Sequence, residues 1–471
     1  MSKNKLSIMW FKEDLRINDN PALFNSLNEG LVIPLYIFDN SLKEEDKMGE
    51  ASKWWLHHSL SDLNKNLNDK LSFFIGNPLN ILENLIDKNN VENVFWNRSY
   101  EPSLLERDKI IKKKLLASGI IVKTYNASLL WESHEILKED KTPYRVFTPF
   151  YRKGCLNNKP PRSVYSKPKI ENLICSRTDT NISELCLLGN NNWHLKFNKH
   201  WKVGEINAQK KLSDFIKTGL SDYKNGRNFP AKNNVSKLSP HIHFGEISPH
   251  TIWNEINKSS DLENKNVDHF KSELGWREFS KYLLFHFPEI TNSNFQKKFD
   301  NFPWIKDHNL FTLWKKGKTG YPTVDAGMRE LWETGYVHNR VRMIVSSFLV
   351  KNLLIDWRLG ERWFWECLVD ADQANNKASW QWVAGSGADA APYFRIFNPV
   401  TQGMKFDPDG NYTKKYVPEL RNLDIKYLFN PWEADFDTLQ NAGITLGKNY
   451  PKPIVDLKSS RNKALEIFSK L

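Results

Sequence analysis

The chain has 471 residues, enough for about three domains of ~150 residues or for two larger ones. Its composition, 40% hydrophobic and 26% charged, allows a sizeable core and excludes general disorder. The four cysteines show no CxxC pair or regular spacing, so neither a metal site nor a disulfide framework is predicted. The apolar runs are far shorter than the ~18 residues of a membrane span, and no signal-peptide core is present. We therefore expect a cytoplasmic protein without membrane contact.

The positive charge is concentrated in one part of the chain. Lys and Arg number 67 against 55 Asp and Glu, which leaves a net charge of +12. Residues 141–240 alone hold 19 basic and 6 acidic side chains, whereas residues 1–130 hold 17 of each. Such a band favours a polyanionic partner or a phosphate-bearing cofactor, although a solvated basic linker would have the same composition.

Five short apolar runs in the first 130 residues are typical of buried strands. They cover residues 6–11, 31–38, 71–75, 91–96 and 120–125. Helical stretches lie between them, at about residues 21–28, 52–68, 78–88 and 103–117. This alternation predicts a doubly wound α/β domain with a parallel sheet. No GxGxxG follows the first strand, which argues against a nicotinamide-type pyrophosphate site there.

The rest of the chain changes character twice. Residues 131–200 have weak periodicity and basic, proline-containing stretches, so we expect a connecting segment, most simply a linker. From residue 201 to residue 471 strand signals almost vanish, which predicts an all-α domain. Its clearest helices are expected over 268–287, from Pro322 to a stop before Gly335, and over 338–354.

One face of the helix expected at 268–287 combines three side chains suited to binding. Glu273, Trp276 and Arg277 are spaced at i, i+3 and i+4 and therefore share a face. A carboxylate, a large flat ring and a guanidinium form an unusual core stripe, which favours a functional site. The alternative is a half-buried tryptophan flanked by an ordinary Glu–Arg pair.

Two later segments hold polar side chains at similarly close spacing. In the helix over 338–354, Asn339, Arg342 and Met343 share a face, unless Asn339 only satisfies its own helix end. The stretch 370–382 contains two carboxylates, two consecutive amides and two indoles. Carboxylates this close repel unless one is paired or protonated, so we expect a basic partner, with Arg342 as the candidate. Simple surface polarity is the alternative.

A candidate for holding phosphate lies inside the basic band. It combines Tyr223, Arg227 and the run 236–239 before a proline. Hydroxyls and backbone amides at the start of a helix bind phosphate oxygens well. By itself this pattern is common.

Seven motifs occur in order along nearly the whole chain. They are WFKEDLR (10–16), SELGWREF (272–279), GKTGYP (317–322), HNRVRM (338–343), DWRLGER (356–362), NNKASWQW (375–382) and PYFRIFNP (392–399). Together they resemble the signatures of the DNA photolyase and cryptochrome family, most closely the class I cyclobutane pyrimidine dimer photolyases.

This resemblance implies an α/β antenna domain followed by a helical domain that holds FAD, with FADH⁻ as the active form. Asn376 matches the position beside the flavin N5, where plant cryptochromes usually have Asp, and Arg342 and Asp370 match an ion pair beside the flavin. The implied FAD-binding residues are Tyr223, Ser236, Lys237, Leu238, Ser239, Arg342, Asp370, Ala371, Asp372 and Asn376.

The resemblance also assigns an electron relay and a lesion pocket. The relay runs from the flavin to the surface through Trp380, Trp357 and Trp304. The pocket, which takes a pyrimidine dimer flipped out of the duplex, is matched by Glu273, Trp276, Asn339, Met343 and Trp382. The implied DNA contacts are Arg227, Glu273, Trp276, Arg277, Asn339, Arg340 and Gln402.

Three details refine the expectation. The (6-4) photolyases carry a pair of essential histidines where this chain has Asn339 and Met343, which favours a cyclobutane substrate. Residues 103–104 are Ser-Leu where folate-binding members have Asn-Glu, which argues against folate and leaves a deazaflavin, another flavin or an empty antenna site open. Gly275 costs its helix up to about 1 kcal/mol relative to Ala unless close packing requires it.

We therefore expect a monomeric carbon–carbon lyase that repairs cyclobutane pyrimidine dimers in single- or double-stranded DNA. Blue light would excite FADH⁻, which donates an electron to the flipped-out lesion. Three alternatives stay open. They are a cryptochrome-type photoreceptor without repair, a (6-4) photolyase, and a nucleic-acid-binding module without flavin.

Overall fold

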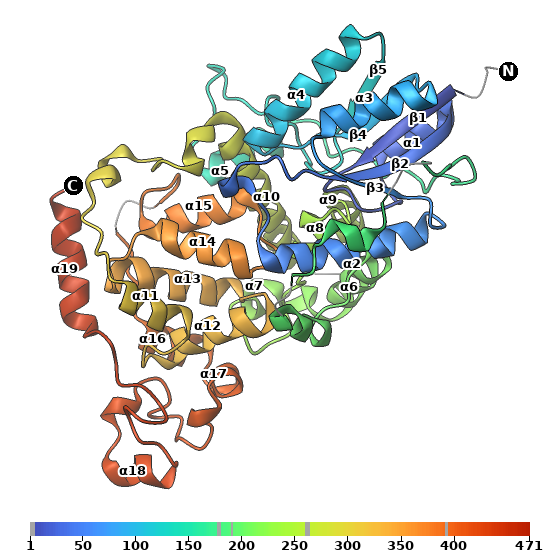
Figure 1. Ribbon diagram of the computed structural model, residues 1–471. Helices are drawn as coiled ribbons and strands as arrows, with labels where there is room; N and C mark the ends of the chain where they lie inside the picture. Colours follow the sequence, from blue (N-terminus) through green and yellow to red (C-terminus); the bar gives the residue numbers. More distant parts are fainter. Residues whose placement is uncertain (1–4, 177–179, 190–191, 260–263, 391–393) are drawn as a thin grey trace. The chain divides into compact units, whose positions relative to one another are not determined.

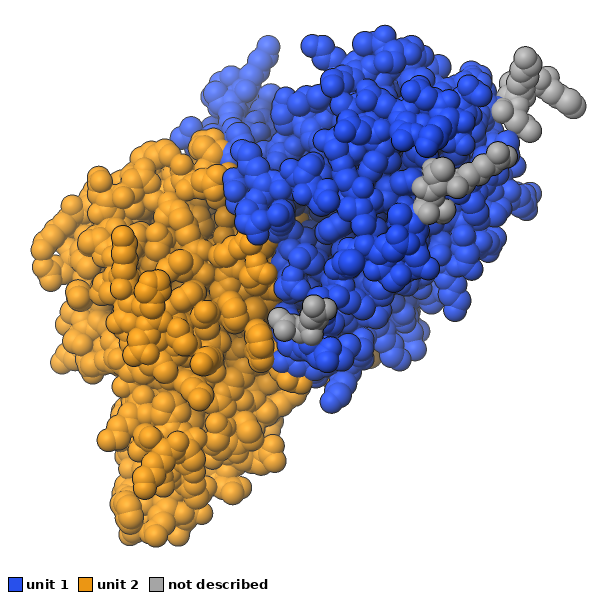
Figure 2. Space-filling model, viewed as in Figure 1, with its two compact units in different colours: residues 1–217, 236–288 blue, residues 218–235, 289–471 orange. Residues whose placement is uncertain are grey.

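The chain forms two compact units (Figure 2). The computed structural model describes residues 5–176, 180–189, 192–259, 264–390 and 394–471. Unit 1 comprises residues 1–217 and 236–288, and unit 2 comprises residues 218–235 and 289–471. The segment after the sheet packs within unit 1, and the domain bounds expected at residues 130 and 200 stay a prediction.

Unit 1 contains a five-stranded parallel sheet with the order β3-β2-β1-β4-β5 (Figure 1). The strands are β1 (Lys5–Phe11), β2 (Gly30–Phe38), β3 (Ser72–Ile75), β4 (Asn93–Asn97) and β5 (Ile121–Tyr125). In the central register Ile8 lies opposite Ile33 on one side and Val94 on the other. The expected strands and their parallel arrangement are confirmed.

Helices follow the first four strands, as the alternation of patterns predicts. They are α1 (Pro21–Glu29), α2 (Glu50–Asn66), α3 (Pro78–Asn89) and α4 (Pro102–Ala117). Ile8 and Trp10 of β1 share a buried cluster with residues of α3 and α4, while Met9 and Phe11 point to the opposite side and are buried as well. Both faces of the sheet are therefore covered, and the doubly wound α/β architecture is confirmed.

The stretch expected to be a simple linker packs against the sheet. Leu173 bridges to Val32 of β2, and Thr180 bridges to Phe73 of the edge strand β3. The helical pieces of this stretch and of the rest of unit 1 are α5 (Phe147–Pro149), η2 (Phe150–Cys155), η3 (Ile182–Leu185), η4 (Asn192–Lys199), α6 (Glu205–Thr218), α8 (Ser239–His243), α9 (Pro249–Asn257) and α10 (Asn264–His286). Beyond β5 the chain thus shields an otherwise open sheet edge.

Unit 2 is helical in the part of it that the structure describes, with one isolated bridge between Leu446 and Tyr450. Its main helices are α7 (Tyr223–Gly226), α11 (His308–Lys315), α12 (Pro322–Thr334), α13 (Asn339–Ser347), α14 (Trp357–Cys367), α15 (Gln373–Ala384), α16 (Pro399–Phe406), α17 (Asn411–Tyr416), α18 (Phe436–Asn441) and α19 (Leu457–Ser469). The predicted start of α12 at Pro322 and its stop before Gly335, which has a φ of 67°, are confirmed. No helix among the described residues is long and apolar enough to cross a bilayer.

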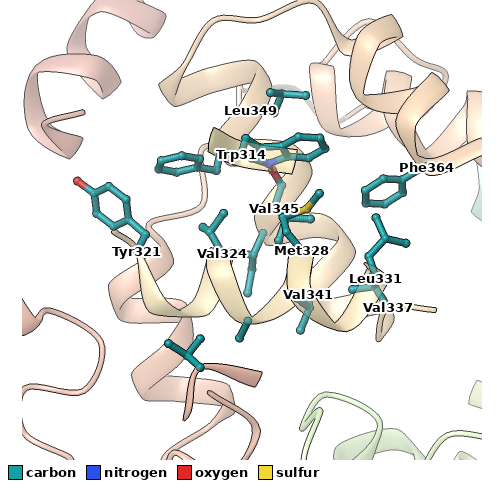
Figure 3. Close-up of a cluster of buried hydrophobic side chains, with 14 of the residues drawn as sticks. Trp314, Tyr321, Val324, Met328, Leu331, Val337, Val341, Val345, Leu349 and Phe364 are labelled. Carbon is teal, nitrogen blue, oxygen red and sulfur yellow. Dashed lines mark hydrogen bonds between the residues drawn. The ribbon is translucent and has the colours of Figure 1, made fainter. Parts of the chain in front are cut away.

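The core of unit 2 surrounds Trp314. Side chains of α12 and α13 meet around its ring (Figure 3), and its indole N–H donates to the carbonyl of Val345 at 3.0 Å. The helix expected over 338–354 is not continuous α-helix, because α13 passes into a π-helix, η8, over Phe348–Asn352. The extra residue of a π-turn changes the faces that follow it, which a 3.6-residue period does not reveal.

Candidate functional site

The predicted lesion-binding face of α10 lies in unit 1. Trp276 is half-buried, and its ring stacks on Phe147 with centroids 3.8 Å apart and planes 11° apart. Phe147 in turn stacks on Tyr151, so the three rings form a continuous stack. Glu273 is half-buried one turn before Trp276, with its carboxylate 3.9 Å from Nε2 of His269. The ring and the carboxylate are thus presented side by side.

The two neighbours of Trp276 in sequence contribute to its support. A Cβ on Gly275 would stand 2.6 Å from the ring of Tyr151, so close packing does require glycine at this position. Arg277 donates to the carbonyl of Ser128 at 2.7 Å and to Glu278 at 2.9 Å. The guanidinium is therefore directed to these groups, and a DNA contact by Arg277 stays a prediction.

The phosphate candidate at 236–239 also belongs to unit 1. Lys237 has a left-handed backbone with φ of 51°, and the hydroxyl of Ser236 accepts the N–H of Leu238 at 3.4 Å. Lys237 and Ser239 are exposed, whereas Leu238 is buried. The turn leads into the five-residue helix α8, and its role in binding phosphate stays a prediction.

The ion pair expected between Arg342 and Asp370 is present in unit 2. Nη2 of Arg342 lies 2.8 Å and 3.0 Å from the two carboxylate oxygens of Asp370, and its Nε donates to the carbonyl of Val337 at 2.7 Å. Burial lowers the pKa of Arg342, but Asp370, Tyr336 and Glu330 together outweigh burial, so the pKa rises overall. Asp372, two residues on, accepts the N–H of Asn375 at 2.8 Å and caps α15.

Asn376 is buried on the first turns of α15, and its side chain is fixed by one neighbour. Its amide nitrogen donates to the carbonyl of Glu361 at 3.1 Å and to the Glu361 carboxylate at 2.7 Å. Lys377 pairs with the other carboxylate oxygen of Glu361 at 2.7 Å. Because both amide hydrogens are used, Asn376 has its carbonyl oxygen to offer to a ligand.

The three predicted relay tryptophans belong to one hydrophobic cluster of unit 2. Trp380 on α15 packs edge-on against Phe364 at 5.0 Å. Trp357, at the start of α14, is fully buried, and its indole N–H donates to Oδ1 of Asn294 at 3.0 Å. Trp304 is half-buried against Phe302 at 4.2 Å. The order from buried to half-buried is the one that a relay toward the surface needs, and electron transfer itself stays a prediction.

The remaining predicted pocket residues in unit 2 differ in exposure. Trp382 is half-buried and donates its indole N–H to the carbonyl of Asp389 at 3.1 Å. Met343 is half-buried, and Asn339 is exposed at the first position of α13. The alternative that Asn339 caps its own helix is wrong, because the ring of His338 accepts the N–H of Arg340 at 3.2 Å and provides that cap.

Two predicted DNA-binding arginines lie near one another in unit 2. Arg340 bonds to the side chain of Asn228 and lies 4.3 Å from the ring of Phe406. Burial, together with the positive charge of Arg227, lowers the pKa of Arg340. Gln402 lies one turn before Phe406, and its buried Oε1 accepts no hydrogen bond from the described residues. Two adjacent guanidinium groups favour an anionic ligand.

Sequence reasoning missed three side chains that support these sites. Glu361 lies in the DWRLGER motif without an assigned role, yet it orients Asn376. Glu330 accepts the hydroxyl of Tyr412 at 2.7 Å and the N–H of His338 at 3.3 Å, which fixes the start of α13. Asn294 lies in a polar loop, and no pattern points to it. Only Glu361 could have been found, through its place in a motif.

Comparison with known proteins gives concordant results. Residues 7–167 match the family described as DNA photolyase, and residues 270–470 match the FAD binding domain of DNA photolyase. A deoxyribodipyrimidine photo-lyase of Agrobacterium fabrum is 45% identical over 98% of this chain and 97% of its own length. Cryptochrome-2 of Arabidopsis thaliana is 36% identical over 100% of this chain and 80% of its own length.

A solved structure extends the similarity to three dimensions. The class III photolyase of Agrobacterium tumefaciens superposes with a TM-score of 0.95 at 44% identity, covering 100% of this chain and 98% of that one. That photolyase is of class III, so the expected likeness to class I gains no support from it. Matched along its length in both sequence and structure, the chain belongs to the DNA photolyase and cryptochrome family and carries its FAD-binding domain.

Proposed function

We propose that this protein repairs cyclobutane pyrimidine dimers in DNA, using blue light and FAD in its reduced form FADH⁻. The observation that carries the proposal is the face of α10 on which the carboxylate of Glu273 stands one turn from the stacked ring of Trp276. A flat apolar ring beside a hydrogen-bonding carboxyl group suits a flipped-out pyrimidine dimer better than it suits a protein core.

The residues of unit 2 fit a reduced flavin. The carbonyl oxygen that Asn376 has to offer would accept the N5–H that distinguishes the reduced ring from the oxidised one. The Arg342–Asp370 pair adds a charged group, and the hydrogen bond from Nε of Arg342 to the Val337 carbonyl helps to hold it in place. When bound and excited by blue light, the cofactor supplies the electron that splits the cyclobutane ring.

The side chains then bind and orient the lesion. Trp276, backed by Phe147, offers one fixed aromatic face, and Trp382 is held by its hydrogen bond to the Asp389 carbonyl. Glu273 would accept a hydrogen bond from the pyrimidine edge and fix the position of the dimer. Asn339 and Met343 occupy positions where (6-4) enzymes have histidines, which supports a cyclobutane substrate.

The positive pair Arg227 and Arg340 would hold the DNA backbone. Phosphate contacts release counterions, so affinity for DNA should fall with salt. The tryptophans Trp380, Trp357 and Trp304 would return electrons from the surface and keep the cofactor reduced.

A repair assay tests the proposal directly. Photoreduced holoprotein is incubated with oligonucleotides that carry either one cyclobutane dimer or one (6-4) product, illuminated, and assayed for restored thymines. We expect light-dependent loss of the cyclobutane dimer only. Glu273→Ala should lower the yield several-fold while the flavin content stays unchanged. No loss of either lesion in the wild-type protein would refute the proposal.

A photoreceptor without repair is the second candidate, favoured by the 36% identity to a plant cryptochrome over the whole chain. It predicts the same flavin photochemistry without any repaired DNA. The assay therefore separates the two candidates, because a bleached flavin with intact dimers supports the photoreceptor. Repair of the (6-4) product alone would identify a (6-4) photolyase.

A further inference from the structure

A hydrogen-bonded chain leads from the middle relay tryptophan to the surface. The indole N–H of Trp357 donates to Oδ1 of Asn294 at 3.0 Å, and Nδ2 of Asn294 donates to Oδ1 of Asp300 at 2.7 Å. Trp357 is 0% exposed and Asn294 1%, whereas Asp300 is exposed. The amide therefore stands between a buried indole and a carboxylate.

The order of these groups matters once the tryptophan loses an electron. Oxidation makes the indole N–H far more acidic, since the ring then carries a positive charge. A carboxylate at hydrogen-bond distance would take this proton, whereas an amide oxygen accepts a hydrogen bond but is a very weak base. Loss of the proton leaves a neutral radical that oxidises its neighbour poorly, so the positive charge would be trapped at this step.

We propose that Asn294 keeps the proton on Trp357 while the relay operates; this rests on the relay role proposed above. An electron passes from Trp357 to oxidised Trp380, which leaves Trp357 one electron short and still protonated. An electron from Trp304 then restores Trp357. No proton enters or leaves at this residue, and the electron deficit moves to Trp304.

Asp300 adds to the effect from one amide away. Its negative charge polarises the Asn294 amide, which strengthens the hydrogen bond to the indole and stabilises the cationic ring. The guanidinium of Arg358 lies 4.8 Å from the Trp357 ring centroid and acts in the opposite sense, although Asp356 partners it at 3.2 Å. The amide of Asn294 is therefore the group that keeps the proton on the indole of Trp357. The charges of Asp300 and Arg358 adjust the energy of the oxidised, cationic Trp357 ring.

The test exchanges the amide and the carboxylate. The double variant Asn294→Asp/Asp300→Asn keeps one amide and one carboxyl group but places the carboxylate against the indole. Asp300→Asn alone keeps the amide there and is the matched control. Each flavin-loaded protein is excited by a laser flash, and transient absorption distinguishes protonated from deprotonated tryptophan radicals.

We expect the exchanged variant to form a deprotonated radical at Trp357, to lose most of its yield of oxidised Trp304, and to show a solvent deuterium effect. The control variant Asp300→Asn should keep a protonated Trp357 radical and pass the electron deficit on to Trp304. Equal spectra and equal Trp304 yields in the exchanged variant and the wild type would overturn the inference.

Two further measurements keep the outcomes separate. Trp357→Phe tests the relay itself. If the flavin of this variant is photoreduced as fast as in the wild type, the relay role of Trp357 is refuted, and not only the role of Asn294. The wild-type protein needs no folding control, and its transfer from Trp357 to Trp304 should be equally fast in H₂O and D₂O. A strong slowing in D₂O would show that a proton does leave Trp357, against the inference.

Discussion

Lys351 is a buried lysine whose charge state should control the stability of unit 2. It lies in the π-helix η8, is 3% exposed, and donates to the carbonyl of Arg395, with its Nζ 4.1 Å from the ring centroid of Phe394. Burial, and next the positive charge of Arg395, lowers the pKa of Lys351 from 10.5 to about 7. Above this value the folded protein holds a neutral amine.

The sign and size of the effect follow from proton linkage. Between about pH 7 and pH 9 the unfolded chain keeps its proton on Lys351 while the folded chain loses it, so the free energy of unfolding rises with pH. Each pH unit over which only the unfolded chain carries the proton is worth about 1.4 kcal/mol. Near pH 7 the folded lysine is only partly deprotonated, so the lower part of the pH interval contributes less than this. The rise over the interval is therefore about 2 kcal/mol.

The assay compares the wild type with Lys351→Met, which has nearly the same shape and no charge. Urea unfolding is followed by far-ultraviolet circular dichroism at several pH values, and the free energy of unfolding of the variant is subtracted from that of the wild type. Titration of every other group cancels in this difference. Lys405→Met, at an exposed lysine of unit 2, is the matched control.

We expect the wild-type protein to gain about 2 kcal/mol on the variant as the pH rises from about 7 to 9, with no comparable change for the control. A difference that stays constant over this interval would refute the reasoning. It would mean that Lys351 keeps its charge in the folded protein, or that water reaches it.

Three further predictions concern the site. A Cβ on Gly360 would lie 2.2 Å from the ring of Trp380, so Gly360→Ala should cost about 1–3 kcal/mol in urea unfolding despite the better helix propensity of Ala, and a stabilised variant would contradict this packing. Gly275→Ala should displace Tyr151 and weaken the binding of dimer-containing DNA, measured by fluorescence anisotropy. Unchanged affinity would show that the stacking of Tyr151 and Phe147 behind Trp276 does not contribute to lesion binding. Arg227→Ala should lower affinity for damaged and undamaged DNA alike and reduce the slope of log affinity against log salt by about 1, whereas an unchanged slope would exclude a phosphate contact.

The α/β part of the fold could be predicted because strands buried on both faces of the sheet consist of short runs of apolar residues. Short apolar runs alternate with amphipathic stretches, and the helix caps at Asn20 and Asn77 precede prolines. The ion pair of Arg342 with Asp370 could be predicted as well, since two close carboxylates require a basic partner.

The parts that were missed depend on contacts between distant residues. The packing of residues 131–200 depends on bridges such as the one between Val32 and Leu173. An irregular segment has no hydrophobic periodicity from which such bridges could be predicted. The π-turn after Ser347 keeps a helical composition, so its shift of register is invisible in the sequence. Asn294 meets Trp357 across 63 residues, and only the folded chain shows that its amide has a partner.

The contacts of Asn376 limit how easily the site could change chemistry. Replacing Asn376 by the aspartate of plant cryptochromes alters few atoms, but the two hydrogens now given to Glu361 would be lost. The new carboxyl group would face a carbonyl and a carboxylate, so it would be stable there only as the neutral acid. A single substitution would thus replace a fixed hydrogen-bond acceptor by a protonated carboxyl group next to the proposed flavin site. Glu361, whose motif gives no hint of this role, would then decide whether that proton is held or released.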